Sequence, residues 1–175
     1  MKFYSFDEYK LMNESVKYHI DNDLSITESI YRIGSDAYCD FVNEVRRLNQ
    51  DNKIELSDSD KFIVERLQTG TKAIYKPRGG NEKEVVLDSP ERGGKKKFIV
   101  YRNSGKKNDD GVIIAKAIEW GDPKLTVKNH DEKASKSFRA RHRCTEKTDQ
   151  MTAGWWACNV HKFWKQLGLK SDKPW

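Results

Sequence analysis

The hydrophobic pattern of this chain changes its period at Gly70. Before that residue, apolar side chains recur at the three- and four-residue spacing of an amphipathic helix. The clearest such stripe comprises Tyr38, Phe41, Val42, Val45 and Leu48. After Gly70, short runs of β-branched and aromatic residues are separated by Gly, Pro and Asn-Asp clusters, which is typical of strands and turns. The chain is therefore expected to contain a helical region followed by a strand-rich one.

The pattern predicts three helices in the helical region, with a short turn over residues 24–31 between the first two. The first is expected over 6–20 and to begin with a capping box between Ser5 and Glu8. The other two are expected from Ser35 to about Leu48, and from Ser57 or Ser59 to Gly70.

The pattern of the strand-rich region predicts a hairpin with strands over residues 97–102 and 112–119. The polar loop between them, 103–111, is expected to be mobile. Further short strands are expected over 73–75, 84–87 and 125–127. Two helices follow, one capped by Asp131 and one carrying Trp155, Trp156 and Phe163. The predicted fold is α+β: a small helical bundle over 1–70, then a small antiparallel sheet packed with two C-terminal helices over 71–175.

The two halves of the chain carry opposite charge. Residues 1–90 hold 13 Lys and Arg against 17 Asp and Glu, a net of −4, and residues 91–175 hold 20 against 10, a net of +10. A basic half with interleaved aromatic residues is typical of a protein that binds phosphate groups, although ordinary solvated surface is the alternative interpretation. The candidate polyanion-binding residues are Lys95, Lys96, Lys97, Lys106, Lys107, Arg139, Arg141 and Arg143.

The apolar runs are too short to cross a bilayer, and the first ten residues lack the apolar centre of a secretory signal. The three cysteines are an odd number, which argues against a secreted scaffold built on disulfides. We therefore expect a soluble protein, without a membrane partner, that is made in a reducing cytoplasm.

Residues 137–165 hold two cysteines, two histidines and three tryptophans. The spacing of the two cysteines and two histidines predicts a structural zinc site with the ligands His142, Cys144, Cys158 and His161. A pair of buried free thiols and a disulfide between Cys144 and Cys158 are the alternatives. Cys39 is expected to pack as a small hydrophobic residue. The tryptophans are interpreted as core residues, because they recur at helical spacing, with a stacking platform for bases as the alternative.

Catalytic signals are weak. The Gly79-Gly80 and Gly93-Gly94 pairs lack the Lys-Ser/Thr ending of a phosphate-binding loop, so nucleotide binding is not expected. A metal-assisted nuclease would need His142 or His130 beside an acid such as Asp131, and no such pair is evident. We predict that the protein is not an enzyme.

Several motifs of this chain resemble those of a protein family encoded by contractile-tailed (myovirus-type) bacteriophages of marine and freshwater bacteria. The resemblance covers nearly the whole chain and rests on the stretches 93–101 (GGKKKFIVY), 120–123 (WGDP), 137–144 (SFRARHRC) and 152–158 (TAGWWAC). The family has Phe where this chain has Trp120, and its counterpart of His161 is often not histidine. The resemblance thus supports only His142, Cys144 and Cys158 as ligands.

The stretches 5–9 (SFDEY) and 13–15 (NES) are also similar to capsid-targeting peptides of such phages, which a maturation protease removes after the Glu. Packing of Phe6, Tyr9 and Met12 in the helical bundle is the alternative.

These observations predict a multi-copy structural or head-associated protein of the virion, made in the host cytoplasm. It would bind other virion proteins and packaged DNA, the latter without sequence preference. An intracellular nucleic-acid-binding protein is the first alternative, and a metal-assisted nuclease is the second.

Overall fold

The computed structural model describes residues 2–3, 6–128 and 130–170. Contacts within the chain divide it into two compact units. Unit 1 comprises Met1–Ser89 and Asn103–Ala115, and unit 2 comprises Pro90–Arg102 and Lys116–Trp175. These bounds differ from the expected division at residue 70, because the two long strands of the hairpin each begin in one unit and end in the other.

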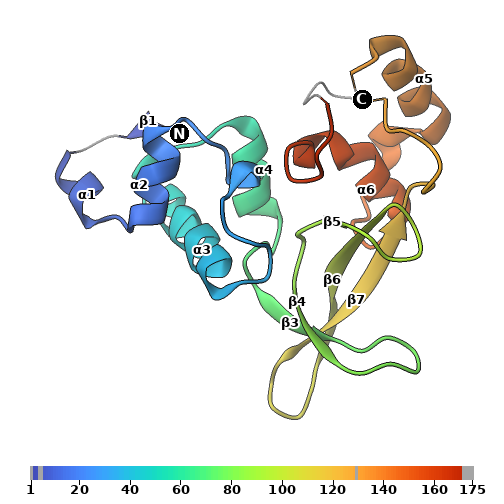
Figure 1. Ribbon diagram of the computed structural model, residues 1–175, viewed down its shortest axis with the longest axis horizontal. Helices are drawn as coiled ribbons and strands as arrows, with labels where there is room; N and C mark the ends of the chain where they lie inside the picture. Colours follow the sequence, from blue (N-terminus) through green and yellow to red (C-terminus); the bar gives the residue numbers. More distant parts are fainter. Residues whose placement is uncertain (1, 4–5, 129, 171–175) are drawn as a thin grey trace. The chain divides into compact units, whose positions relative to one another are not determined.

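The chain is mixed α and β, as predicted, but its sheet is larger than the predicted hairpin (Figure 1). Five strands form one sheet in the order β4-β3-β7-β6-β5. Their bounds are β3 Lys72–Tyr75, β4 Lys83–Val86, β5 Glu91–Arg92, β6 Phe98–Lys107 and β7 Ile113–Trp120. The sheet is also not purely antiparallel, because β3 pairs with β7 in parallel through Ile74 and Ile114. A separate two-stranded sheet joins β1 (Lys2–Phe3) to β2 (Ile54–Glu55).

Unit 1 holds four α-helices and one 3₁₀ turn among its described residues. They are α1 Phe6–Leu11, α2 Glu14–Asp21, η1 Ile26–Glu28, α3 Asp36–Gln50 and α4 Asp58–Arg66. Helices α3 and α4 begin where predicted, because the Ser35 and Ser57 side chains accept hydrogen bonds from the backbone N–H groups of Tyr38 and Asp60.

The predicted helix over 6–20 is wrong, because the chain breaks at Asn13. The Asn13 side chain accepts a hydrogen bond of 2.9 Å from the backbone N–H of Val16 and so starts α2 anew. The predicted capping box at Ser5 and Glu8 falls outside the described residues.

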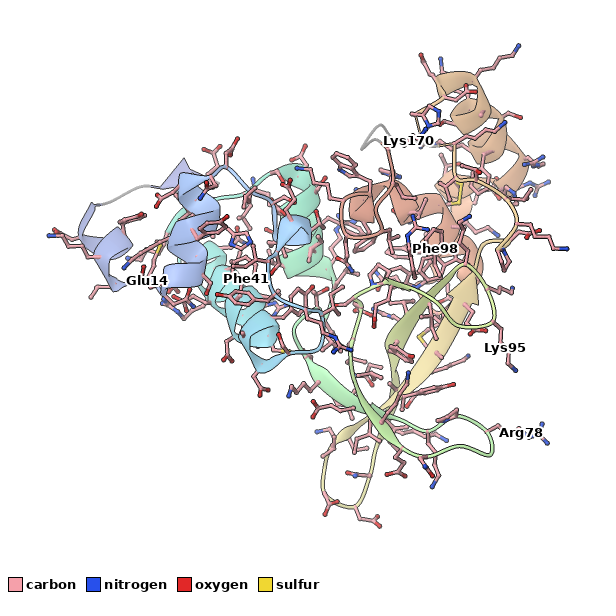
Figure 2. The ribbon with its side chains drawn as sticks, viewed as in Figure 1. Glu14, Phe41, Arg78, Lys95, Phe98 and Lys170 are labelled. Atoms are coloured by element: carbon pink, nitrogen blue, oxygen red, sulfur yellow. A yellow bond between two sulfur atoms is a disulfide. The ribbon has the colours of Figure 1, made fainter. Side chains whose placement is uncertain are left out.

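The core of unit 1 is mostly aliphatic, and α3 supplies much of it. Phe41, Val42 and Val45 are fully buried on this helix (Figure 2 labels Phe41), which confirms the predicted stripe. Cys39 is also buried, as expected. The carboxylate of Asp60 lies in the same core, where its Oδ1 accepts from the Ile26 N–H at 2.9 Å and its Oδ2 from the Ser57 hydroxyl at 2.8 Å.

The hairpin loop is shorter than predicted. Strand β6 continues to Lys107, and the backbone N–H of Asn108 donates to the carbonyl of Val112 at 2.9 Å. The Ser104 hydroxyl also donates to the carbonyl of Ile114 at 2.6 Å. Most of the expected nine-residue loop is therefore strand, since cross-strand hydrogen bonds continue beyond the point where the apolar pattern ends.

Unit 2 places short helices against the β5, β6 and β7 residues that belong to it. They are α5 Glu132–His142, η2 Cys144–Glu146, α6 Ala153–Asn159 and η3 Val160–Phe163. The last predicted helix is therefore shorter than expected and continues as a 3₁₀ turn. The predicted strand over 125–127 is wrong: these residues have no regular structure, and Leu125 is 65% exposed.

Candidate nucleic-acid interface and neighbouring cavity

Helix α5 is positioned at both ends by local hydrogen bonds. The Asp131 carboxylate accepts from the backbone N–H of Ala134 at 3.0 Å, and this bond holds the pKa of Asp131 below its usual value. At the other end Arg143 adopts a left-handed conformation, with φ of 49°, and its N–H donates to the carbonyl groups of Arg139 and Ala140. The helix therefore has defined limits, and its side chains keep fixed directions around its axis.

One side of α5 is a continuous basic stripe. Three of its members, Lys133, Lys136 and Arg139, recur every three residues on the helix, and the fourth, Arg143, is the residue that caps its end. All four are exposed, and we call them the basic face. Two of the four have nearby carboxylates. Lys136 Nζ lies 2.7 Å from Glu132 Oε1, and Arg143 Nη1 lies 4.0 Å from Glu146 Oε2. Each of those glutamates is itself exposed, so the stripe remains open to solvent.

The three arginines predicted to bind a polyanion do not lie on one side of α5. Arg139 lies on the basic face and Arg143 caps the end of the helix, whereas Arg141 lines the cavity on the opposite side of the helix from Arg139. Sequence reasoning missed Lys133 and Lys136, although their three-residue spacing to Arg139 was a readable signal.

The opposite side of α5 lines a cavity of about 460 Å³ that lies wholly within unit 2. Ala134, Phe138, Arg141 and His142 form this cavity face of the helix. The remaining wall comes from the start of β6, the end of β7, the segment 121–128, α6 and the first residue of η3. Its apolar side chains are Phe98, Trp120, Leu125, Val127, Ala157 and Val160.

The lysines before β6 divide between surface and cavity wall. Lys95 and Lys96 are exposed, and Figure 2 shows Lys95 projecting away from the ribbon. The backbone N–H of Lys95 donates to Glu119 Oε1 at 2.8 Å and fixes this turn. Lys97 instead is half-buried in the cavity wall, where its Nζ donates to the carbonyl of Leu125. Lys97 is therefore held in the fold and is less suited to bind a phosphate than its two neighbours.

Lys106 and Lys107 are exposed at the end of β6, in the part of this strand that belongs to unit 1. These two lysines therefore lie next to each other, but they belong to a different unit from the other candidate cations.

In the structure the two clustered cysteines are paired with each other, so the disulfide alternative is the one observed. Cys144 and Cys158 form a disulfide with a Cα–Cα distance of 5.5 Å, and it connects η2 to α6 (Figure 2). Zinc binds deprotonated thiolates, so paired sulfur atoms cannot serve as its ligands. The predicted site of His142, Cys144, Cys158 and His161 is therefore not formed in this oxidised chain. Among the described residues, no group of three or more His, Cys, Asp and Glu side chains is arranged to hold a metal ion.

Trp155 and Trp156 are core residues, as predicted, and so is Trp120, whereas Trp164 is half-buried. Trp156 is fully buried, and its Nε1–H donates to the carbonyl of Gln150 at 2.8 Å. Its ring lies 4.9 Å from that of Trp155 and 5.8 Å from that of Trp120. Because all three side chains are buried, they offer no surface on which bases could stack.

The nuclease alternative gains no geometric support. Asp131 uses its carboxylate to cap α5, and the ring of His142 lies tilted against that of Phe138 with centroids 4.2 Å apart.

Comparison of the chain with known protein families, with curated proteins and with solved structures found no match. Within the described part of the chain, none of the helices combines the length and the apolar character that a transmembrane segment needs.

Proposed function

We propose that this protein is a non-enzymatic binding protein of a phage virion, and that unit 2 binds packaged DNA through its charge rather than its sequence. The observation that carries the DNA-binding part is the basic face of α5, where three exposed cations recur on one side of the helix and a fourth, Arg143, caps its end. The motif resemblance to a contractile-tailed phage family supports the virion setting.

The charge of the whole unit supports the same proposal. Unit 2 holds 18 Lys and Arg against 8 Asp and Glu, a net of +10, whereas unit 1 holds 15 against 19, a net of −4. Cations that neutralise phosphates release condensed counterions, so affinity for a polyanion falls steeply as salt rises. Lys95 and Lys96 would add to this surface. A helix face that presents only Lys and Arg contacts the DNA backbone and carries no reading of base sequence.

The test is fluorescence anisotropy with a random-sequence duplex over a series of salt concentrations. We expect a Kd of about micromolar near physiological salt, with no sequence preference and no cleavage. In the triple variant Lys136→Gln/Arg139→Gln/Arg143→Gln, the slope of log K against log salt should become less steep by up to about three units. The matched control is Arg32→Gln/Lys61→Gln/Arg66→Gln, which removes three exposed cations from unit 1 and should leave the slope unchanged.

An affinity that does not depend on salt would contradict the proposal. An unchanged slope together with a lower melting temperature of the α5 variant would instead show that these cations stabilise the fold or its assembly by pairing with carboxylates of the same chain or of a neighbouring subunit.

The second function is that of a nucleic-acid-binding protein acting inside the infected cell, and the same surface supports it. Mass spectrometry of purified virions separates the two settings, since a structural protein is present in a fixed copy number and an intracellular one is absent.

A further inference from the structure

The cavity on the other side of α5 is not explained by polyanion binding. Its wall is mainly apolar, and its volume of about 460 Å³ lies within the range of about 300–1,000 Å³ that is usual for ligand sites. The cavity opens to solvent, because Leu125, Lys128 and Arg141 on its wall are all exposed. It can therefore take in a large apolar group from outside.

The charges around this opening are nearly all positive. Lys97, Lys128 and Arg141 belong to its wall, and His142 adds a further imidazole. Asp122 is the one carboxylate among the described lining residues, and its Oδ1 already accepts from the backbone N–H of Lys124 at 2.8 Å. An occupant that brings negative charge beside its apolar group would thus complement the opening.

We propose that this cavity is a docking site for a partner protein's peptide segment in which a large aromatic or aliphatic residue is flanked by Asp or Glu. The apolar residue enters between Phe138, Val160 and Leu125, and the flanking carboxylates face Lys128 and Arg141. This site is separate from the DNA-binding surface, because the two use opposite sides of α5.

A nucleobase is a less suitable occupant. Base recognition combines a flat stacking surface with polar groups that read the base edge. Phe98 and Trp120 are buried in this wall and present little ring surface. The accessible rings are those of Phe138 and His142, which lie against each other with an angle of 34° between their planes and do not form one flat surface.

The test begins with a random heptapeptide library displayed on phage and selected against the immobilised full-length protein, with heparin present to occupy the basic face. We expect the enriched peptides to carry an aromatic or large aliphatic residue beside at least one Asp or Glu. The strongest peptide is then synthesised with a fluorescein label, and its affinity is measured by anisotropy.

Variants on the two sides of α5 locate the binding. Phe138→Ala and Arg141→Glu should each weaken the peptide by at least about tenfold. A version of the peptide with Lys in place of its Asp and Glu should bind Arg141→Glu better than it binds the native chain. Arg139→Glu, the matched control on the basic face, should bind the original peptide as the native chain does. Arg141 is exposed, so its variant tests the site even where Phe138→Ala disturbs folding.

Several outcomes would overturn the proposal. These are enrichment of basic peptides, no enrichment above that obtained with Arg141→Glu, and equal affinity for native chain and variants. Loss of oligothymidylate binding in Phe138→Ala would identify a nucleobase site, and a concentration-dependent dimer that this variant abolishes would identify a second copy as the occupant. Failure of the DNA-binding proposal would appear in the Arg139 variant, so the two can fail separately.

Discussion

Unit 1 and unit 2 differ in charge, in core composition and in how their elements are held. Unit 1 is acidic, and its buried polar side chains include His19, Asp60, Thr69 and Asp88. Unit 2 is basic, contains all five tryptophans of the chain, and has Ser135 as its one buried polar side chain among the described residues. Hydrogen bonds between buried polar groups contribute to the core of unit 1, whereas the core of unit 2 is stabilised by buried aromatic rings and a disulfide.

This difference explains why the candidate binding features lie in unit 2. Its short helices have little regular structure between them, so a compact aromatic core and a covalent link can hold α5 while both sides of that helix remain accessible. In unit 1 the apolar sides of α3 and α4 face its own core instead. Because every tryptophan belongs to unit 2, tryptophan fluorescence reports on that unit alone and can be compared with far-UV circular dichroism, to which the helices of unit 1 contribute strongly.

The largest effect is expected for Trp156→Ala. Removing this fully buried side chain should cost unit 2 about 3–5 kcal/mol, because it leaves a large void among Trp120, Trp155 and Phe163. The urea midpoint followed by tryptophan fluorescence should fall sharply, while most of the helical signal of unit 1 persists. Trp156→Phe should lose less, since it keeps an aromatic ring. If both signals were lost at one urea midpoint, the two units would unfold together, and the contrast drawn between them would not hold.

Breaking the disulfide should have the next largest effect. Cys144 and Cys158 are 14 residues apart, and a loop of that size is worth about 3 kcal/mol by restricting the unfolded chain. Cys144→Ala/Cys158→Ala should lower the fluorescence midpoint, and a reducing agent should lower it in the native chain but not in the double variant. An unchanged midpoint in both cases would mean that the link contributes nothing to unit 2.

A smaller effect should distinguish the buried polar groups of unit 1. His19 donates from Nδ1 to the carbonyl of Ser15 at 2.8 Å and stacks on Phe41, and burial lowers its pKa from the usual 6.5. The unfolded chain therefore takes up a proton at a higher pH than the folded one. Unit 1 should lose stability as the pH falls below about 6.5, until the lowered folded pKa is passed.

Titration of the Asp60 carboxyl should change the stability of unit 1 in the opposite direction. Burial raises its pKa above 3.8, so its protonation relieves a cost as the pH falls towards that value. The effect of His19 is measured by urea denaturation followed by far-UV circular dichroism, at pH values between 7.5 and 5.5, in the native chain and in a His19 variant. The variant His19→Gln should show a flatter profile than the native chain, and equal profiles would remove His19 as the cause.

Several features followed from local sequence alone. The Ser35, Ser57 and Asp131 caps, the buried stripe of α3 and the core role of the tryptophans were all predicted, because each depends on residues within a turn or two. The division of charge between the ends of the chain is likewise a property of the sequence.

Other features depended on contacts between distant residues. The parallel pairing of β3 with β7 joins Ile74 to Ile114, and no local pattern indicates it. The choice between zinc ligands and a disulfide depended on how η2 meets α6, since spacing alone allowed both.

The cavity was not predictable at all, because its wall combines residues from β6, β7, α5 and α6. The sequence by itself determined where most helices begin, which side chains are buried and which half is basic, since these depend on short-range hydrogen bonds and on solvation. Only the tertiary structure decided that Arg141 faces a cavity while Arg139 faces solvent, because the two sides of a helix become different only when another element packs against one of them.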